Sequence, residues 1–224
     1  MPPPRLRVFS SSVGTKILIG VTGLALFLYL IIHVVGNLIV FLGPSAFNKY
    51  AYTLEGNALL PLVEMGLLLI FVMHIYKTVK MYIANRRARP VGYVKKRLAG
   101  PPSRKSLASS TMIVSGLWLV AFLIIHVKAF RFSVDYPWPA GGRDLYRLEL
   151  QNLASPLMFV FYAVSMVVVG SHLWHGVSSA FQSLGADQPR WTPRVLVFGK
   201  TMAVLIAGAF IVIAAWAHFV GAHQ

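Results

Sequence analysis

The chain has 224 residues, of which 57% are hydrophobic and 12% are charged, and its mean hydropathy is +0.67. A composition this apolar excludes an ordinary soluble domain and a disordered chain, and it is typical of an integral membrane protein. Twenty-one Lys and Arg against six Asp and Glu give a net charge of +15, with the cations gathered beside apolar segments. Such basicity usually reports membrane topology and contact with anionic lipid or a partner protein, so we expect no nucleic-acid partner.

Five apolar segments are long enough to cross a membrane, at about 17–42, 58–83, 107–132, 153–181 and 195–221. Each could cross about 30 Å of hydrocarbon at roughly 1.5 Å per residue. The first exceeds the short apolar core of a signal peptide and lacks a small-residue cleavage site, so we expect it to be retained. The sequence therefore predicts an all-α integral membrane protein, a five-transmembrane-helix bundle that forms a single membrane domain over residues 1–224.

The cations are distributed unevenly between the two sides of this bundle. When loops are assigned alternately, sixteen of the 21 cations fall on one side, and ten of those lie between Lys77 and Lys105. The positive-inside rule then places the N-terminus in the cytoplasm and the C-terminus outside. We expect a multi-pass protein of the inner (cytoplasmic) membrane.

The chain contains no Cys, which excludes disulfides, iron–sulfur clusters, thiolate-ligated haem and covalently attached c-type haem. Among the six acidic residues, only Glu64 is expected inside a membrane segment. A carboxylate-rich metal site is therefore not expected, and histidine is the main candidate ligand.

Four histidines lie within four different apolar segments: His33, His74, His126 and His172. In hydrocarbon an imidazole needs partners for its ring nitrogens. Counting residues from the segment ends places His33 and His126 in the outer half of the membrane, and His74 and His172 in the inner half. Two bis-histidine sites at two depths suit haem b, whose iron takes two axial nitrogens from facing helices.

A membrane histidine can also have roles other than haem ligation. A single intramembrane histidine usually makes a helix-to-helix hydrogen bond, but four matched in depth by pairs favour ligation. Zinc is disfavoured because acidic and thiol co-ligands are lacking. His175 competes with His172 for the ligand role, and we expect His218 and His223 to be interfacial or exposed histidines.

Small and basic residues near these histidines are candidates for the haem surroundings. Gly36 and Gly176 share a helix face with His33 and His172, where a small residue would leave room for a macrocycle. Three cations near helix ends could neutralise haem propionates: Lys77, Lys128 and Arg131.

One segment of the fourth apolar run reads His172-Leu173-Trp174-His175-Gly176 and continues through Ser179, Gln182 and Leu184-Gly185. It resembles the fourth helix of the cytochrome b membrane-anchor subunit of succinate dehydrogenase and fumarate reductase. The single-subunit, five-helix, di-haem branch is similar at His33-Val34-Val35-Gly36-Asn37, at His74-Ile75-Tyr76 leading to the stretch from Asn85 to Pro90, and at Ile125-His126. In that family the first histidine of an H-x-x-x-G pattern ligates haem, which implies His172 rather than His175.

The resemblance implies an anchor with two haem b groups and no substrate-oxidising site of its own. A flavoprotein subunit with FAD and an iron–sulfur subunit would dock on its cytoplasmic face, and electrons would pass between succinate and a membrane quinone. The di-haem branch usually works with menaquinone. The complex could also oligomerise.

Two sets of residues are candidates for quinone sites. Glu64, near the outer start of the second segment, could hold or pass a proton at a quinol site beside the outer haem. Its alternative role is a helix N-terminal carboxylate at the membrane interface. Ser11, Ser12 and Lys16 could line a second pocket at the cytoplasmic start of the first segment, or serve as a helix cap and interfacial anchor.

Two other functions stay open at this point. One is a haem b anchor of another respiratory oxidoreductase, of the nitrate reductase or formate dehydrogenase type. Those families resemble the chain less, because here each of the first four segments supplies one ligand candidate. The other is a haem-free membrane transporter, which predicts no visible haem absorbance.

Overall fold

The computed structural model describes residues 11–88, 106–134 and 136–221. These residues form helices and turns, with one isolated β-bridge between Pro137 and Arg143. Five of the described helices are long and apolar enough to cross a membrane, which confirms the predicted all-helical class. They are α2 (Ser12–Leu38, continued by the 3-10 helix η1, Ile39–Leu42), α4 (Leu60–Arg87), α6 (Met112–Phe130), α8 (Pro156–Ser183) and α9 (Thr192–Phe219).

Three shorter helices join these five. They are α3 (Pro44–Glu55), α5 (Leu107–Ser110) and α7 (Leu145–Ala154). The sequence did not predict α3 or α7, and it merged α5 with α6 into a single segment, 107–132. The predicted segment 153–181 also began too early, since Leu153 belongs to α7. Ser155, with ψ 122°, is extended before Pro156, which is the conformation that a residue preceding proline favours.

Local chemistry explains where the first membrane helix begins and ends. The Ser11 hydroxyl accepts a hydrogen bond from the Gly14 N–H at 3.0 Å and so caps the N-terminus of α2. At its other end, α2 tightens into η1 and stops at Gly43, whose φ of +90° is a conformation that glycine adopts at little cost. Pro44 then starts α3, since its missing N–H is not needed in a first helical turn.

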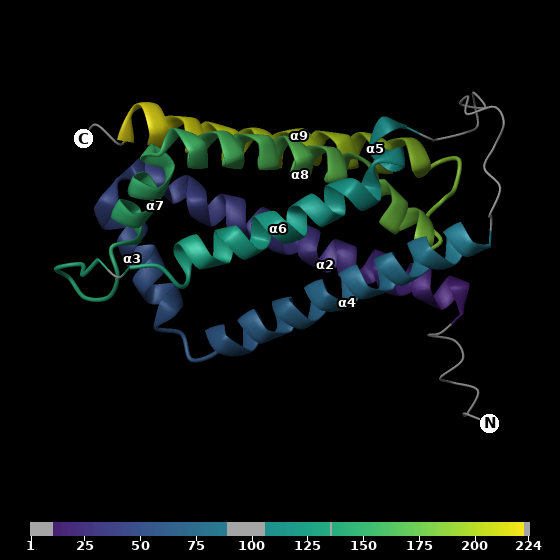
Figure 1. The fold of residues 1–224 in the computed structure, drawn as a ribbon, viewed down its shortest axis with the longest axis horizontal. Helices are drawn as coiled ribbons and strands as arrows, with labels where there is room; N and C mark the ends of the chain where they lie inside the picture. The colour runs from purple at the N-terminus through teal and green to yellow at the C-terminus, as the bar shows by residue number, and fades with distance from the viewer. Residues whose placement is uncertain (1–10, 89–105, 135, 222–224) are drawn as a thin grey trace.

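The helices form an elongated bundle in which α8 and α9 lie side by side (Figure 1). This is the most extensive contact between two helices of the described chain, and α2 in turn packs on α4, α8 and α9. A Cβ atom added at Gly170 would lie 3.0 Å from the Ala207 Cβ, so the two backbones approach closely there. Small residues at such crossings are the usual means of packing helices in lipid.

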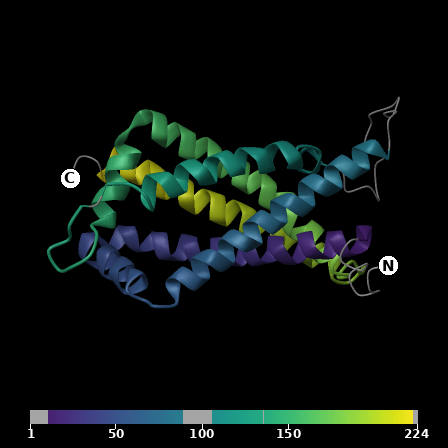
Figure 2. The ribbon, with the colours of Figure 1, turned by 60° about the horizontal axis from the view of Figure 1, so that its bottom comes forward.

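Helix α4 is the most loosely held of the five. None of its residues, all of which the structure describes, is buried, and it rests mainly on α2 with a smaller contact to α6. Figure 2 shows α4 crossing the bundle obliquely. One end of the bundle holds the start of α2, the end of α4, α5 and the turn between α8 and α9, and we call it the α5 end (Figure 1). The opposite end, here the α3–α7 end, holds those two short helices and the end of α9.

Candidate functional site

His33 and His126 face each other from α2 and α6. Their ring centroids lie 5.9 Å apart, with an angle of 89° between the ring planes. Two imidazoles that bind one metal ion at about 2 Å place their ring centroids roughly 6 Å apart. The separation of this pair therefore fits a single metal ion held between two ring nitrogens.

Aromatic side chains surround this pair, which we call the outer pair because the sequence predicts it for the outer half of the membrane. Tyr29 stacks on His33 with a centroid distance of 5.4 Å and an interplanar angle of 15°. Phe122 stacks on His126 at 5.5 Å and 28°. Such packing restricts the rotation of both rings, so the ring orientation is fixed by the fold before anything binds.

His74 and His172 form the inner pair, on α4 and α8. Unlike His33 and His126, these two imidazoles make no ring contact with each other in the described chain, so their pairing rests on the depth of each along its helix. Glycines on the neighbouring helices leave room for both rings: a Cβ atom at Gly23 would lie 3.2 Å from His74 Cε1, and one at Gly116 would lie 3.8 Å from His172 Cε1. Among the described residues no three His, Asp or Glu side chains converge, so the site histidines occur as pairs.

Hydroxyl groups on neighbouring helices hold both inner histidines by Nδ1. Thr22 Oγ1 on α2 lies 3.0 Å from His74 Nδ1, and Ser115 Oγ on α6 lies 3.0 Å from His172 Nδ1. Each hydroxyl already donates its single hydrogen to a carbonyl of its own helix, Thr22 to Leu18 at 2.6 Å and Ser115 to Met112 at 3.0 Å. A hydroxyl whose hydrogen is used in this way accepts from the histidine, and the imidazole proton is then on Nδ1 with the free lone pair on Nε2.

The outer histidines are held at the same ring position. The Tyr162 hydroxyl on α8 lies 3.1 Å from His126 Nδ1. On α2, the Asn37 side-chain nitrogen donates to the His33 carbonyl at 2.7 Å and lies 3.4 Å from His33 Nδ1. All four rings thus have a polar partner at Nδ1, and no described residue forms a hydrogen bond with any of their Nε2 atoms. A metal-binding histidine donates its other ring N–H to an acceptor, a role that the hydroxyls of Thr22, Ser115 and Tyr162 can fill. The Asn37 amide nitrogen can only donate, so the contact at His33 Nδ1 is of a different kind.

The remaining histidines have different surroundings. His175 is half-buried on α8, and no described residue forms a hydrogen bond with its ring. His218 is half-buried near the end of α9, where its Nδ1 lies 2.9 Å from the Leu153 carbonyl and its ring stacks on Phe159 at 4.6 Å. That contact ties α9 to α7 and gives His218 a packing role. His223 lies outside the described residues.

Gly36 and Gly176, the two glycines predicted to leave room for a haem macrocycle, lie against different groups. A Cβ atom at Gly176 would lie 4.0 Å from His172 Cδ2, so Gly176 borders the inner pair. A Cβ atom at Gly36 would lie 2.5 Å from the Tyr50 hydroxyl, so Gly36 makes room for a side chain of α3. The space beside His33 is instead bordered by Tyr29 and Phe210.

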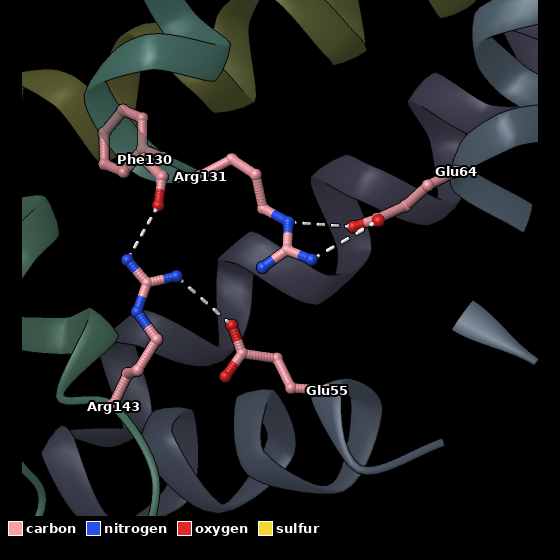
Figure 3. A network of polar contacts seen from close by, with 5 residues as sticks. All are labelled: Glu55, Glu64, Phe130, Arg131 and Arg143. Carbon is pink, nitrogen blue, oxygen red and sulfur yellow. Dashed lines mark hydrogen bonds and ion pairs between the residues drawn. The ribbon is translucent and has the colours of Figure 1, made fainter. Parts of the chain in front are cut away.

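Two arginine–glutamate pairs join helices at the α3–α7 end (Figure 3). Arg131, just after α6, binds Glu64 on α4 through both carboxylate oxygens, at 3.2 and 3.4 Å, and both side chains are about half exposed. Arg143 binds Glu55 of α3 at 3.5 Å and donates to the Phe130 carbonyl at 3.2 Å. Arg131, predicted to face a propionate, and Glu64, predicted to handle a proton, are thus partners of each other.

The other predicted residues lie apart from the histidine pairs or beside them. Ser12 and Lys16 are exposed in the first turns of α2, and Lys128 is exposed near the end of α6. Lys77 is half-buried on α4. Its neighbour Thr78, one turn beyond His74, has a buried hydroxyl with no hydrogen-bond partner among the described residues. An open groove of about 420 Å³ at the start of α9 includes none of these residues.

Sequence reasoning missed the polar groups that orient the rings. Thr22 and Ser115 are lone hydroxyl residues within apolar segments, at depths that match the inner pair, and that pattern could have found them. Tyr162 gave no distinct signal in the sequence, because an aromatic residue in a membrane segment usually serves to pack against apolar neighbours. Glu149 was also missed: the structure buries it, with 5% of its surface exposed, whereas Glu64, the acid expected inside the membrane, is ion-paired and exposed.

Comparison with protein-family models, curated proteins and solved structures finds no match for the chain. Its function is therefore inferred from the geometry of the two histidine pairs and from the sequence motifs around them.

Proposed function

We propose that the chain is the di-haem b membrane anchor of a succinate:quinone oxidoreductase, respiratory complex II. The observation that carries the proposal is the placement of four membrane histidines on four helices at two depths, with the His33 and His126 ring centroids 5.9 Å apart and a polar side chain beside each Nδ1. A hydrogen-bonding role between helices does not require such pairing by depth, whereas haem b takes two axial nitrogens from facing helices.

The residues present suit two haem b groups. His33 and His126 would hold the outer group and His74 and His172 the inner one, each through Nε2. Bound haem b supplies one-electron transfer within the membrane. The chain itself contributes ring orientation, an apolar setting, and near the inner pair the buried hydroxyl of Thr78, which has a hydrogen to donate to a polar group.

The distribution of charge supports docking of soluble partners at the α5 end. Its described cations include Arg194, whose guanidinium lies 5.1 Å from the Trp191 ring centroid, and Lys200, which lies 5.3 Å from that of Trp174. Cations beside tryptophan are favoured at the membrane interface, where anionic lipid also binds. We place this end, with the N-terminus, on the cytoplasmic side, facing a flavoprotein and an iron–sulfur subunit. FAD and the clusters belong to those partners, since the chain has no Cys.

We place a quinone site, for menaquinone, beside the outer pair. Glu64 is bound by Arg131, which directly follows α6, the helix that carries His126, so this carboxylate lies at the same end of the bundle as the outer site. Glu64 would accept a proton released on quinol oxidation, and Arg131 would hold the carboxylate in place. In a Glu64→Gln variant we expect both haem signals to be retained and quinone-linked activity to fall. Unchanged activity would remove Glu64 from the mechanism.

The decisive experiment is a reduced-minus-oxidised spectrum of the purified native complex with succinate as donor. We expect two haem b signals, with one lost in His33→Ala or His126→Ala and the other lost in His74→Ala or His172→Ala. His218→Ala is the matched control, since that ring packs α9 against α7 and Phe159 of α8, and it should keep both. His175→Ala tests the competing ligand and should also keep both.

The outcome separates the candidate functions. A complex that is colourless when native cofactors are preserved would refute haem binding and favour a transporter. The four ligand candidates come from four helices, which favours the complex II anchor over an anchor of the formate dehydrogenase or nitrate reductase type, and the electron donor tests this choice. Haems that formate reduces and succinate does not would assign the chain to that second class.

A further inference from the structure

Asn37 differs from the other polar partners of the four site histidines. It lies on α2, one turn after His33, and its side-chain nitrogen lies 3.4 Å from His33 Nδ1. The same nitrogen donates to the His33 carbonyl oxygen at 2.7 Å. A carbonyl oxygen accepts only from a donor, so the group at this distance is the NH2 of the amide and not its oxygen. The backbone of α2 therefore fixes which way the Asn37 amide points.

This orientation places a donor beside His33 Nδ1, where ligation through Nε2 requires an acceptor. A neutral imidazole carries one proton, and a ring that accepts a hydrogen bond at Nδ1 carries that proton on Nε2. Iron binding through Nε2 needs the opposite tautomer, with the proton on Nδ1 and a free lone pair on Nε2. Among the described residues, Asn37 is the one hydrogen-bond partner of this ring, so a proton on Nδ1 would have no acceptor.

The other three site histidines have partners that can accept. The hydroxyls beside the inner pair donate their hydrogens to carbonyls of their own helices, which leaves their oxygens free to accept from Nδ1 of His74 and His172. The Tyr162 hydroxyl lies beside His126 Nδ1 and can accept in the same way. Of the four rings, His33 is therefore the one held in the tautomer that does not bind a metal ion.

Packing keeps the His33 ring next to Asn37. Tyr29 stacks on this ring, and the ring centroids of Phe210 and His126 lie 5.6 and 5.9 Å from its own. The two nitrogens belong to one rigid ring, so a rotation that took Nδ1 away from Asn37 would also move Nε2. Ligation by His33 in its present position therefore needs a change of tautomer and the loss of the Asn37 contact at Nδ1.

We propose that Asn37 makes His33 the weakest of the four ligands, so that the outer site holds its haem less tightly than the inner site. The inference rests on the proposed function, and Asn37 is a positioning residue that acts through His33. When His33 binds iron, Nε2 gives its proton to water and Nδ1 takes one from water, so the ring stays neutral. The Asn37 N–H then faces another N–H, and its hydrogen bond to Nδ1 is lost. The inner site binds without such a loss.

The first test is haem retention in the purified native complex, measured as transfer of each haem to an excess of apomyoglobin. We expect the outer haem, identified as the one lost in His126→Ala, to leave first in wild type. Asn37→Leu keeps the approximate side-chain shape and removes the donor. The outer haem should then leave about 2–10-fold more slowly, the factor that corresponds to one neutral hydrogen bond. A purely structural role for Asn37 predicts the reverse, a faster loss.

A second variant supplies the missing acceptor. Asn37→Asp places carboxylate oxygens where the amide was, and an acceptor at Nδ1 makes a histidine a more basic ligand. The midpoint potential of the outer haem should fall and its retention should rise, while the inner haem keeps both values.

Asn152→Leu is the matched control for the loss of the amide. The Asn152 side-chain nitrogen also donates to the carbonyl four residues earlier, that of Leu148 at 3.0 Å, but it forms no hydrogen bond with a histidine. Both haems should be retained in this variant as in wild type.

Three outcomes would overturn the inference. One is an outer haem that leaves Asn37→Leu at or above the wild-type rate while the inner haem is retained. Another is equal retention of the two haems in wild type, and the third is an outer-haem potential in Asn37→Asp equal to that of wild type. A complex without haem would instead refute the proposed function.

Discussion

Thr22→Val tests whether the hydroxyl groups beside Nδ1 orient the histidines of the inner pair for metal binding. The substitution keeps the side-chain shape and removes the acceptor at 3.0 Å from His74 Nδ1, at a position with 9% exposure. An unpaired N–H in an apolar site costs about 1–3 kcal/mol, and loss of a group that orients a metal-binding histidine typically weakens metal binding roughly 10–100-fold. We expect weaker haem retention at the inner site only, measured by haem transfer to an excess of apomyoglobin and by the haem spectra.

Thr53→Val provides the control for this change. Thr53 is an exposed helical threonine whose hydroxyl donates to the Lys49 carbonyl at 2.8 Å, as Thr22 does to Leu18, but it contacts no histidine. Both haems should be retained in that variant as in wild type. The reasoning would be refuted if Thr22→Val released haem at the wild-type rate and left both spectra unchanged, because the Nδ1 contact would then have no part in ligation.

Three further predictions address packing, pH and topology. Gly23→Ala places a Cβ atom 3.2 Å from His74 Cε1, so we expect a shifted inner-haem spectrum at unchanged outer-haem content. Glu149 has a pKa raised to about 8, so the folded protein binds its proton more tightly than the unfolded chain does, and stability falls as the pH rises from 4.5 toward 8. Thermal unfolding in detergent should show Glu149→Gln more stable than wild type at pH 7, by an amount on the order of 3 kcal/mol, and equal to it near pH 4; a constant difference would contradict this. Because the chain lacks Cys, single thiols are unambiguous probes, and an impermeant maleimide applied to intact cells should label Thr53→Cys but not Gln188→Cys. The reverse pattern would invert the proposed topology.

The membrane helices could be predicted because their signal is local. Each apolar run of spanning length became a helix, since in lipid only a helix satisfies its own backbone groups. The short helices α3 and α7 could not be found the same way, because they are amphipathic and depend on packing at the α3–α7 end. Asn48 illustrates this: its buried side chain donates to Asp144 and accepts from the Tyr146 N–H, contacts that join residues almost a hundred positions apart.

For the candidate site, the sequence could predict the depth of each histidine in the membrane but not the contacts of its ring. Counting residues along each segment put His33 level with His126, and the 5.9 Å contact between their rings agrees. Depth places Thr22 and Ser115 level with the inner pair, but it gives no information on rotation about the helix axis, so the contact of each hydroxyl with a particular ring nitrogen could not be predicted. Glu149 falls between two predicted membrane segments, where a carboxylate is expected to face water. Its spacing with Leu145, Leu148 and Leu153 on one helical face was the signal that it would be enclosed.

The close packing of α8 on α9 has a consequence for how the protein is made. A ribosome delivers the chain from its N-terminus, so α8 enters the bilayer before α9, the helix with which it makes its most extensive contact, exists. Until the final segment has been translated, the helix that carries His172 has only its contacts with the earlier helices, chiefly α2 and α6. A transcript cut short after α8 would encode all four imidazoles, yet its product would lack the support that keeps the last of them in register.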